Sequence, residues 1–160
     1  MTTDLAPVAE IRTVRVGDVL PELVRTPTTT QLVMYAGAEH DYMPVHFDHH
    51  YAVAAGQTGV ITHGWLTFAF LLQTVTTWLP PETARVVQAR SRYRRPTYPG
   101  RPVVCRGVVT AVDPTEHGLR IEVHVDAYDG HGPDAVLTTT ADAALLVHPD
   151  AHPHPRRHTP

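Results

Sequence analysis

The spacing of apolar side chains changes half-way along the chain. In the first half, apolar residues follow a helical period, and they are densest from Gly64 to about Trp78. They cover most of the circumference of this predicted helix, so we expect other structure to surround it. The consecutive residues Pro80 and Pro81 end it.

Two shorter helices are predicted upstream, on either side of a loop. The first runs from Gln31 to Ala38 and the second from His49 to Ala55. The loop 39–48 between them contains Pro44. We expect Asp48 to cap the second helix rather than to take part in chemistry.

In the second half, apolar and polar residues alternate, which is typical of β-strands. The pattern indicates an α+β fold in which a strongly curved antiparallel sheet wraps the buried helix. A single domain of residues 1–147 is predicted, with residues 148–160 as a disordered tail rich in Pro and His. The predicted strands cover residues 86–93, 102–112, 119–128 and 136–147.

Composition narrows the class of protein. The 160 residues, with 42% hydrophobic and 18% charged, are typical of one globular domain, and the net charge of −3 argues against nucleic-acid binding. We expect no membrane span and no signal peptide. Cys105 is the only cysteine, which favours a cytoplasmic location and a buried, inert thiol. The 13 basic residues are all arginine, a bias typical of actinobacterial genes.

Three residues have the chemistry to act on an activated double bond. Asp41 and His46 lie five positions apart, and Gly64 begins the apolar helix eighteen residues later. A carboxylate and an imidazole can hold and deprotonate a water molecule. A free N–H group at a helix start can stabilise the oxyanion of a polarised carbonyl. This set suits the addition of water to such a bond, or its removal.

Residues 35–64 resemble the hydratase motif of MaoC-like dehydratases and (R)-specific enoyl-CoA hydratases. That motif is an acid, any residue, Asn-Pro, an aliphatic residue and a histidine, followed by a His-Gly pair at a helix start. Residues 93–100 also resemble the family's strand and Pro-x-x-Pro-Gly turn, and the resemblance covers roughly residues 15–147. In this chain the motif reads Asp41, Tyr42, Met43, Pro44, Val45, His46, Ala52, His63 and Gly64.

The resemblance implies a hot-dog fold that pairs as a double hot-dog homodimer. It implies interconversion of 2-enoyl and 3-hydroxyacyl thioesters, carried on coenzyme A or acyl carrier protein, with no other cofactor and no metal. It assigns Asp41 and His46 to catalysis and Gly64 to binding of the thioester oxygen. Met43 stands where the family has asparagine; we expect it to contact the acyl group, and the alternative is a defect that makes the chain a weak enzyme. Glu39 and His40 also depart from the small residue and glycine usual just before the acid.

Two other functions stay open. The chain could be a catalytically silent or partner-dependent subunit of a heteromeric dehydratase, which an assay of the purified chain would reveal. It could also be a hot-dog thioesterase, which needs a carboxylate on the central helix or at the dimer seam. That helix has no Asp or Glu from Gly64 to Pro81, which argues against a thioesterase.

The remaining histidines and arginines have less specific interpretations. His63 is expected to orient the loop before the helix. A metal cluster would combine His46 with other nearby histidines, but adjacent histidines on a short helix point in different directions and no zinc spacing is present. Alternating arginines on one strand indicate either a solvated outer face or a phosphate-binding face. The histidines are His40, His49 and His50, and the arginines are Arg90, Arg92 and Arg94.

Overall fold

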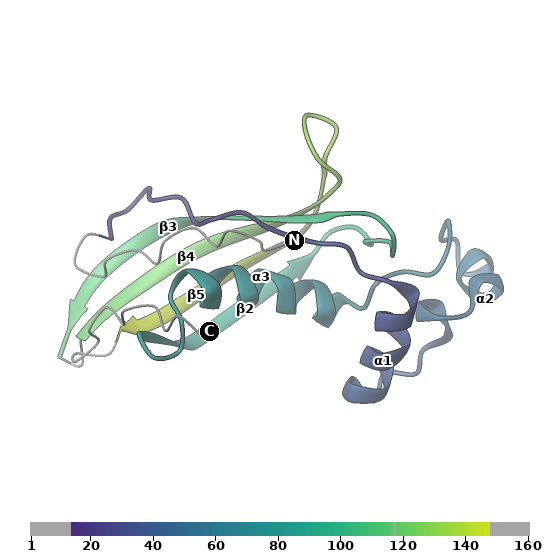
Figure 1. Ribbon diagram of the computed structural model, residues 1–160, viewed down its shortest axis with the longest axis horizontal. Coiled ribbons are helices and arrows are strands. Elements are labelled where there is room, and N and C mark those ends of the chain that lie inside the picture. Colours follow the sequence, from purple (N-terminus) through teal and green to yellow (C-terminus); the bar gives the residue numbers. More distant parts are fainter. Residues whose placement is uncertain (1–13, 117, 148–160) are drawn as a thin grey trace, which may run out of the picture.

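One antiparallel sheet and one long helix make up most of the molecule in a computed structural model that describes residues 14–116 and 118–147 (Figure 1). The strand order in the sheet is β1-β3-β4-β5-β2. The predicted tail, residues 148–160, lies outside the described residues. The strands are β1 (Leu23–Arg25), β2 (Ala84–Tyr93), β3 (Val103–Thr115), β4 (Gly118–Asp129) and β5 (Val136–Val147). The helices are α1 (Thr29–Glu39), the 3-10 turn η2 (Pro44–His46), α2 (His49–Ala54) and α3 (Gly64–Trp78).

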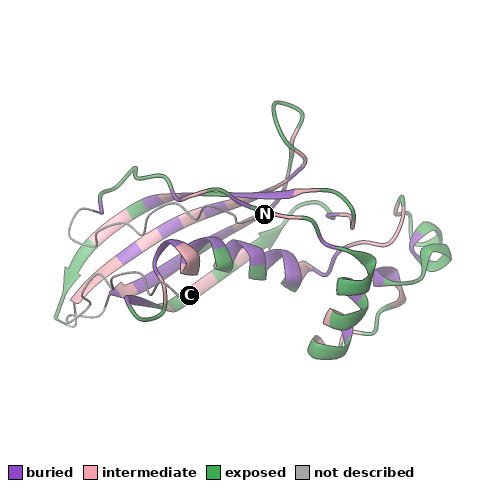
Figure 2. Cartoon of the chain, in the orientation of Figure 1, coloured by how far each residue is buried: buried purple, intermediate pink, exposed green. Residues whose placement is uncertain are grey.

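Helix α3 lies along the concave face of the curved sheet, and it contacts all five strands (Figure 1). Figure 2 shows buried residues both along α3 and along the strands. Leu71 and Val75 of α3 are fully buried, in the same apolar cluster as Ile121, Val123 and Leu145 of the sheet. This is the hot-dog arrangement, so the predicted α+β fold with a wrapped central helix is confirmed.

Both helices upstream of α3 have a capping side chain; α2 begins at His49 as predicted, and α1 begins at Thr29, two residues before the predicted Gln31. The Thr28 hydroxyl accepts a hydrogen bond from the Gln31 N–H at 3.1 Å, and Asp48 Oδ1 accepts one from the Tyr51 N–H at 3.0 Å. Asp48 is therefore a helix cap, as expected. Helices α1 and α2 lie at one end of the molecule, near the start of α3 (Figure 1). The loop between them is thus held close to Gly64.

Strand β3 is longer than the sequence predicts. It continues through Pro114 to Thr115, although the Asp-Pro pair indicated a turn after residue 112. Proline removes a backbone donor and is tolerated at sheet edges. Pro114 pairs with Leu119 of β4, and no strand of the described residues pairs with its other side. No described strand offers an acceptor on that open side, so the N–H that proline lacks there costs the sheet no hydrogen bond.

Cys105 is fully buried in the core on β3. Burial raises the pKa of its thiol to about 12, so it stays protonated and unreactive at neutral pH. This confirms the expectation of an inert thiol. Among the described helices, none has the length and apolar character needed to cross a membrane.

We expect the chain to form a homodimer through the edge of β2. This ten-residue strand pairs with β5 on one side only, and no described strand covers its other side. Pairing with the same edge of a second copy would satisfy the backbone groups left open there. Sedimentation of the purified chain should give a dimer at micromolar concentration. A stable, active monomer would contradict this expectation.

Candidate active site

Asp41 and His46 lie side by side next to the start of α3. His46 Nε2 is 3.6 Å from Asp41 Oδ2, and His46 is buried while Asp41 is half-exposed. A separation of 3.6 Å is too long for a direct hydrogen bond, and it leaves both acceptors within reach of one water molecule. The sequence prediction that these two side chains meet therefore agrees with the geometry.

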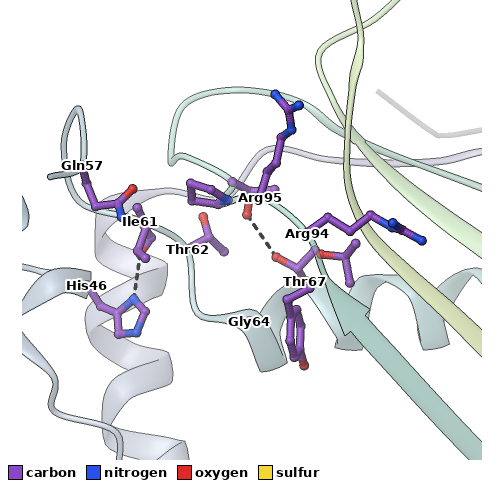
Figure 3. Close-up of a pocket in the computed structure, with 12 residues that line it drawn as sticks. His46, Gln57, Ile61, Thr62, Gly64, Thr67, Arg94 and Arg95 are labelled. Atoms are coloured by element: carbon purple, nitrogen blue, oxygen red, sulfur yellow. Dashed lines mark hydrogen bonds between the residues drawn. The ribbon is translucent and has the colours of Figure 1, made fainter. Parts of the chain in front are cut away.

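A backbone carbonyl determines which nitrogen of His46 carries the hydrogen. His46 Nδ1 lies 2.8 Å from the carbonyl oxygen of Ile61 (Figure 3). A carbonyl oxygen only accepts, so Nδ1 must be the donor. In the neutral ring the lone pair is then on Nε2, which is the nitrogen that faces Asp41. His46 is thus oriented to accept a proton from a group that lies beside both side chains.

The backbone of Met43 holds the carboxylate of Asp41. The Met43 N–H donates to Asp41 Oδ1 at 3.1 Å. The Met43 side chain is 56% exposed and does not line the cavity described below. The asparagine amide usual in the family at this position is therefore not needed for this hydrogen bond.

Gly64 presents a free backbone donor at the start of α3. The first hydrogen bond within the helix runs from the Thr67 N–H to the His63 carbonyl at 3.2 Å, so the Gly64 N–H has no acceptor inside the helix. A Cβ atom at position 64 would lie 3.1 Å from Cε1 of the Tyr93 ring. The absence of a side chain thus lets Tyr93 pack against the helix start.

A cavity of about 320 Å³ lies at the start of α3, and both His46 and Gly64 line it. Figure 3 shows His46 on one side of it and the first residues of α3 on the other. The hydroxyls of Thr67 and Thr97 share a hydrogen bond of 3.1 Å within the lining. Asp41 stands beside His46, outside the set that lines the cavity. The lining residues are His46, Gln57, Ile61, Thr62, Gly64, Thr67, Tyr93, Arg94, Arg95, Pro96, Thr97 and Thr139.

Two arginines line the cavity, and sequence alternation indicated only one of them. Arg94 was grouped with Arg90 on one strand face, but Arg90 lines a separate hollow with Asp142. Strand β2 ends at Tyr93, so alternation does not continue to Arg95. The N–H groups of Arg94 and Arg95 both donate to the Thr138 carbonyl, at 2.8 and 3.1 Å. The irregular backbone after the strand therefore brings both arginines to the cavity.

His63 is a residue of the site whose packing the sequence did not predict. Its ring stacks on His46 with centroids 3.8 Å apart and planes inclined by 19°, and the Tyr35 ring meets it edge-on at 5.2 Å. Burial lowers the pKa of His63, the charge on a protonated His46 lowers it further, and Asp41 partly opposes both effects. His63 therefore favours the neutral form.

The same residues offer donor atoms for a metal ion, but their geometry does not fit one. Ligand atoms of Asp41, His46 and His63 all lie within 4.8 Å of one another. Each imidazole lone pair lies in its ring plane, so two stacked, nearly parallel rings do not aim at a common point, as zinc ligation requires. Nδ1 of His46 is also engaged by Ile61. His40, His49 and His50 are not part of this group.

A profile described as "MaoC like domain" matches residues 13–129. The chain belongs to this MaoC-like family. A match over this much of the chain confirms the resemblance drawn from the motif.

Two proteins with substantial coverage resemble this MaoC-like chain, and one of them is a dehydratase. It is 27% identical over 138 residues to a mitochondrial 3-hydroxyacyl-acyl-carrier-protein dehydratase of Arabidopsis thaliana, which covers 86% of this chain and 81% of the relative. It is 31% identical to a chain of the ChsH1–ChsH2 complex of Mycobacterium tuberculosis, with a TM-score of 0.73 over 85% of this chain and 99% of that chain.

A third comparison concerns the fold of the MaoC-like chain alone. The (R)-hydratase of A. caviae involved in PHA biosynthesis is 18% identical, with a TM-score of 0.75 over 84% of this chain and 98% of that chain. The hot-dog architecture is therefore shared at low sequence identity.

Proposed function

We propose that this chain interconverts 2-enoyl and 3-hydroxyacyl thioesters by adding or removing water. The observation that carries the proposal is the 3.6 Å distance between Asp41 Oδ2 and His46 Nε2, the nitrogen that has the lone pair. This pair lies beside the cavity that Gly64 also lines. Membership of the MaoC-like family and the 27% identity to a 3-hydroxyacyl-acyl-carrier-protein dehydratase support it.

In the hydration direction, both side chains accept hydrogen bonds from one water molecule. The water oxygen bonds to C3 of the enoyl group while one of its protons passes to the Asp41 and His46 pair. The pair returns a proton to C2, so H and OH add across the double bond and no further reactant is needed. Dehydration is the same sequence in reverse. Because the ring is buried and held by Ile61, the lone pair is already aligned for this transfer.

Negative charge develops on the thioester oxygen as water attacks C3. In our proposal that oxygen accepts the N–H of Gly64. The N-terminus of α3 adds the partial positive charge of the helix dipole at the same point. The donor is in place before reaction, so little reorganisation is required when the charge appears.

The substrate's carrier, coenzyme A or acyl carrier protein, has phosphate groups that fit the arginines of the cavity. Arg94 and Arg95 are exposed and line the cavity that contains His46. Guanidinium groups bind phosphate with paired hydrogen bonds. We propose that these two side chains attract the carrier to the site.

An assay of the purified chain with 2-enoyl thioesters on coenzyme A and on carrier protein tests the proposal. We expect conversion to the 3-hydroxyacyl thioester, detected by mass, with one enantiomer formed. Release of a free thiol instead would indicate a thioesterase. No conversion of any substrate, in either direction, would contradict the proposal for the chain by itself.

A partner-dependent subunit is the second candidate function. The observation that favours it is the 31% identity to a chain of the ChsH1–ChsH2 complex. Activity that is absent in the purified chain but present after co-purification with a second MaoC-like chain would support this candidate. Because Asp41, His46 and Gly64 are all present, we favour an active chain.

Replacing Met43 by asparagine should change substrate preference more than it changes catalysis. The Asp41 carboxylate is anchored by the backbone of residue 43, which the substitution retains. We propose that the exposed thioether contacts an acyl group that extends beyond the Asp41 and His46 pair. Met43→Asn should then lower kcat/KM severalfold for long or branched enoyl thioesters and improve it for crotonyl thioesters. A uniform gain across all substrates would contradict the acyl contact.

A further inference from the structure

His63 is almost completely buried, and its ring nitrogens form no well-aligned hydrogen bond with the described residues. The residue is 1% exposed, and a polar neighbour of the ring, the backbone of Asp41, raises its pKa without meeting strict hydrogen-bond geometry. A buried polar atom without a partner is costly, and such atoms are uncommon in folded proteins. The nitrogens therefore do not explain why a histidine ring occupies this position.

Two aromatic side chains contact the His63 ring. One face of His63 lies on the His46 imidazole at 3.8 Å, and the Tyr35 ring is 5.2 Å away at an inclination of 62°. His46 itself has one in-plane contact, from Nδ1 to Ile61. One hydrogen bond still allows some rotation of the ring about its Cβ–Cγ bond, whereas a flat neighbour stacked on its face opposes that rotation. The two contacts together restrict the ring to one orientation.

We propose that His63 is a positioning residue. Its buried, uncharged ring holds the His46 imidazole by stacking, so that Nε2 stays directed at Asp41, and its nitrogens exchange no proton during the reaction. This role of His63 rests on the proposed function only for its kinetic consequences.

The charged and titratable groups around His63 come from three elements. The loop provides Asp41, η2 provides His46, and α1 provides Tyr35, while Glu39 at the end of α1 interacts electrostatically with Asp41 and His46. Burial lowers the pKa of His63 more than any of these groups changes it, and Asp41 opposes the shift. A protonated His63 would place a positive charge against the face of His46 and hinder proton uptake there. A neutral ring stacks without this repulsion.

Nuclear magnetic resonance of the imidazole groups tests the uncharged state without any substrate. The full-length protein is labelled with ¹⁵N and titrated from pH 8 to pH 5.5, and the His63 signals are assigned by their loss in His63→Phe. We expect His63 to remain neutral at pH 6.5, the ordinary pKa of the group. A His63 ring that is half protonated at or above pH 6.5 would overturn the proposal. This result does not depend on whether the proposed reaction occurs.

Two substitutions separate the ring from its nitrogens. His63→Phe retains a flat ring and should keep kcat within about threefold of wild type, because stacking is what the site uses. His63→Ala removes the ring and should lower kcat by about tenfold or more while KM changes less than twofold. The reason is that the His46 imidazole, which would then be misplaced, acts on the chemical step. The melting temperature should be equal or higher in His63→Phe, because the buried, poorly bonded nitrogens are gone.

Thr74→Ala is the matched control for lost packing. Thr74 is buried on α3 and does not line the cavity, and its hydroxyl donates to the Phe70 carbonyl and lies beside the buried Cys105 thiol. We expect it to lower the melting temperature and leave kcat unchanged. If His63→Phe loses as much activity as His63→Ala, the nitrogens are required and the proposal is wrong. If His63→Ala retains wild-type kcat, the stacking has no role and the proposal is also wrong.

Discussion

Replacing Asp41 by asparagine, or His46 by alanine, should lower turnover by about a hundredfold or more, the usual contribution of a general acid–base group. Asparagine keeps the shape of the side chain but cannot take a proton. Alanine removes the His46 ring, whose Nε2 lone pair faces Asp41 at 3.6 Å because Nδ1 is bonded to the Ile61 carbonyl. The double variant should be little worse than either single variant, because both groups act on one water molecule.

Matched substitutions nearby distinguish this effect from general damage to the loop. Asp48→Asn changes an acid that caps α2, where asparagine caps equally well, and His50→Ala changes an exposed histidine of α2. Both should retain wild-type kcat. Steady-state kinetics on one enoyl thioester, with circular dichroism to confirm folding, makes the comparison. Turnover near the wild-type value in Asp41→Asn or His46→Ala would refute their assignment.

Removing the N–H group of Gly64 should reduce kcat by about a hundredfold to a thousandfold, or about 3 kcal/mol of transition-state stabilisation. Gly64→Pro makes this change with little cost to the helix. Proline is favoured at the first position of a helix, where no intrahelical bond is lost. The preceding residue, His63, has φ −54° and ψ 135°, an extended conformation that a following proline accepts.

Gly64→Ala is the control for the added Cβ, while proline adds Cγ and Cδ as well. Both variants place a Cβ about 3.1 Å from Cε1 of Tyr93, but only proline lacks the donor. The Tyr93 ring is 47% exposed and can shift by the few tenths of an ångström required, so alanine should cost less than about tenfold in kcat. Equal losses in the two variants would show that the contact with Tyr93, and not the donor, accounts for the effect.

Local patterns were sufficient to predict the fold. The helical period of apolar residues identified α3, and alternation identified β2 to β5, but the three-residue strand β1 was not among the predicted strands. The Asp48 cap identified the start of α2, whereas α1 begins two residues before the predicted Gln31. The end of β3 was missed, because Pro114 indicates a turn unless the strand is known to lie at an open edge. That edge is a property of the sheet and cannot be read from neighbouring residues.

The site was predictable only where its parts are close in sequence. Asp41 and His46 are separated by five positions, and their spacing is visible in the chain. The stacking of His46 on His63 joins residues seventeen positions apart through the packing of η2 against the start of α3. The Ile61 carbonyl belongs to the backbone, so no residue type indicates its contact with His46.

The hydrogen bond from the Met43 N–H to Asp41 has an evolutionary consequence. Every residue except proline supplies that donor, so position 43 can vary without loosening the acid. Its side chain is then free to drift, or to adapt to a new acyl group, while the chemistry beside it is preserved. A search pattern that demands an asparagine before Pro44 would pass over chains that anchor their acid in this way.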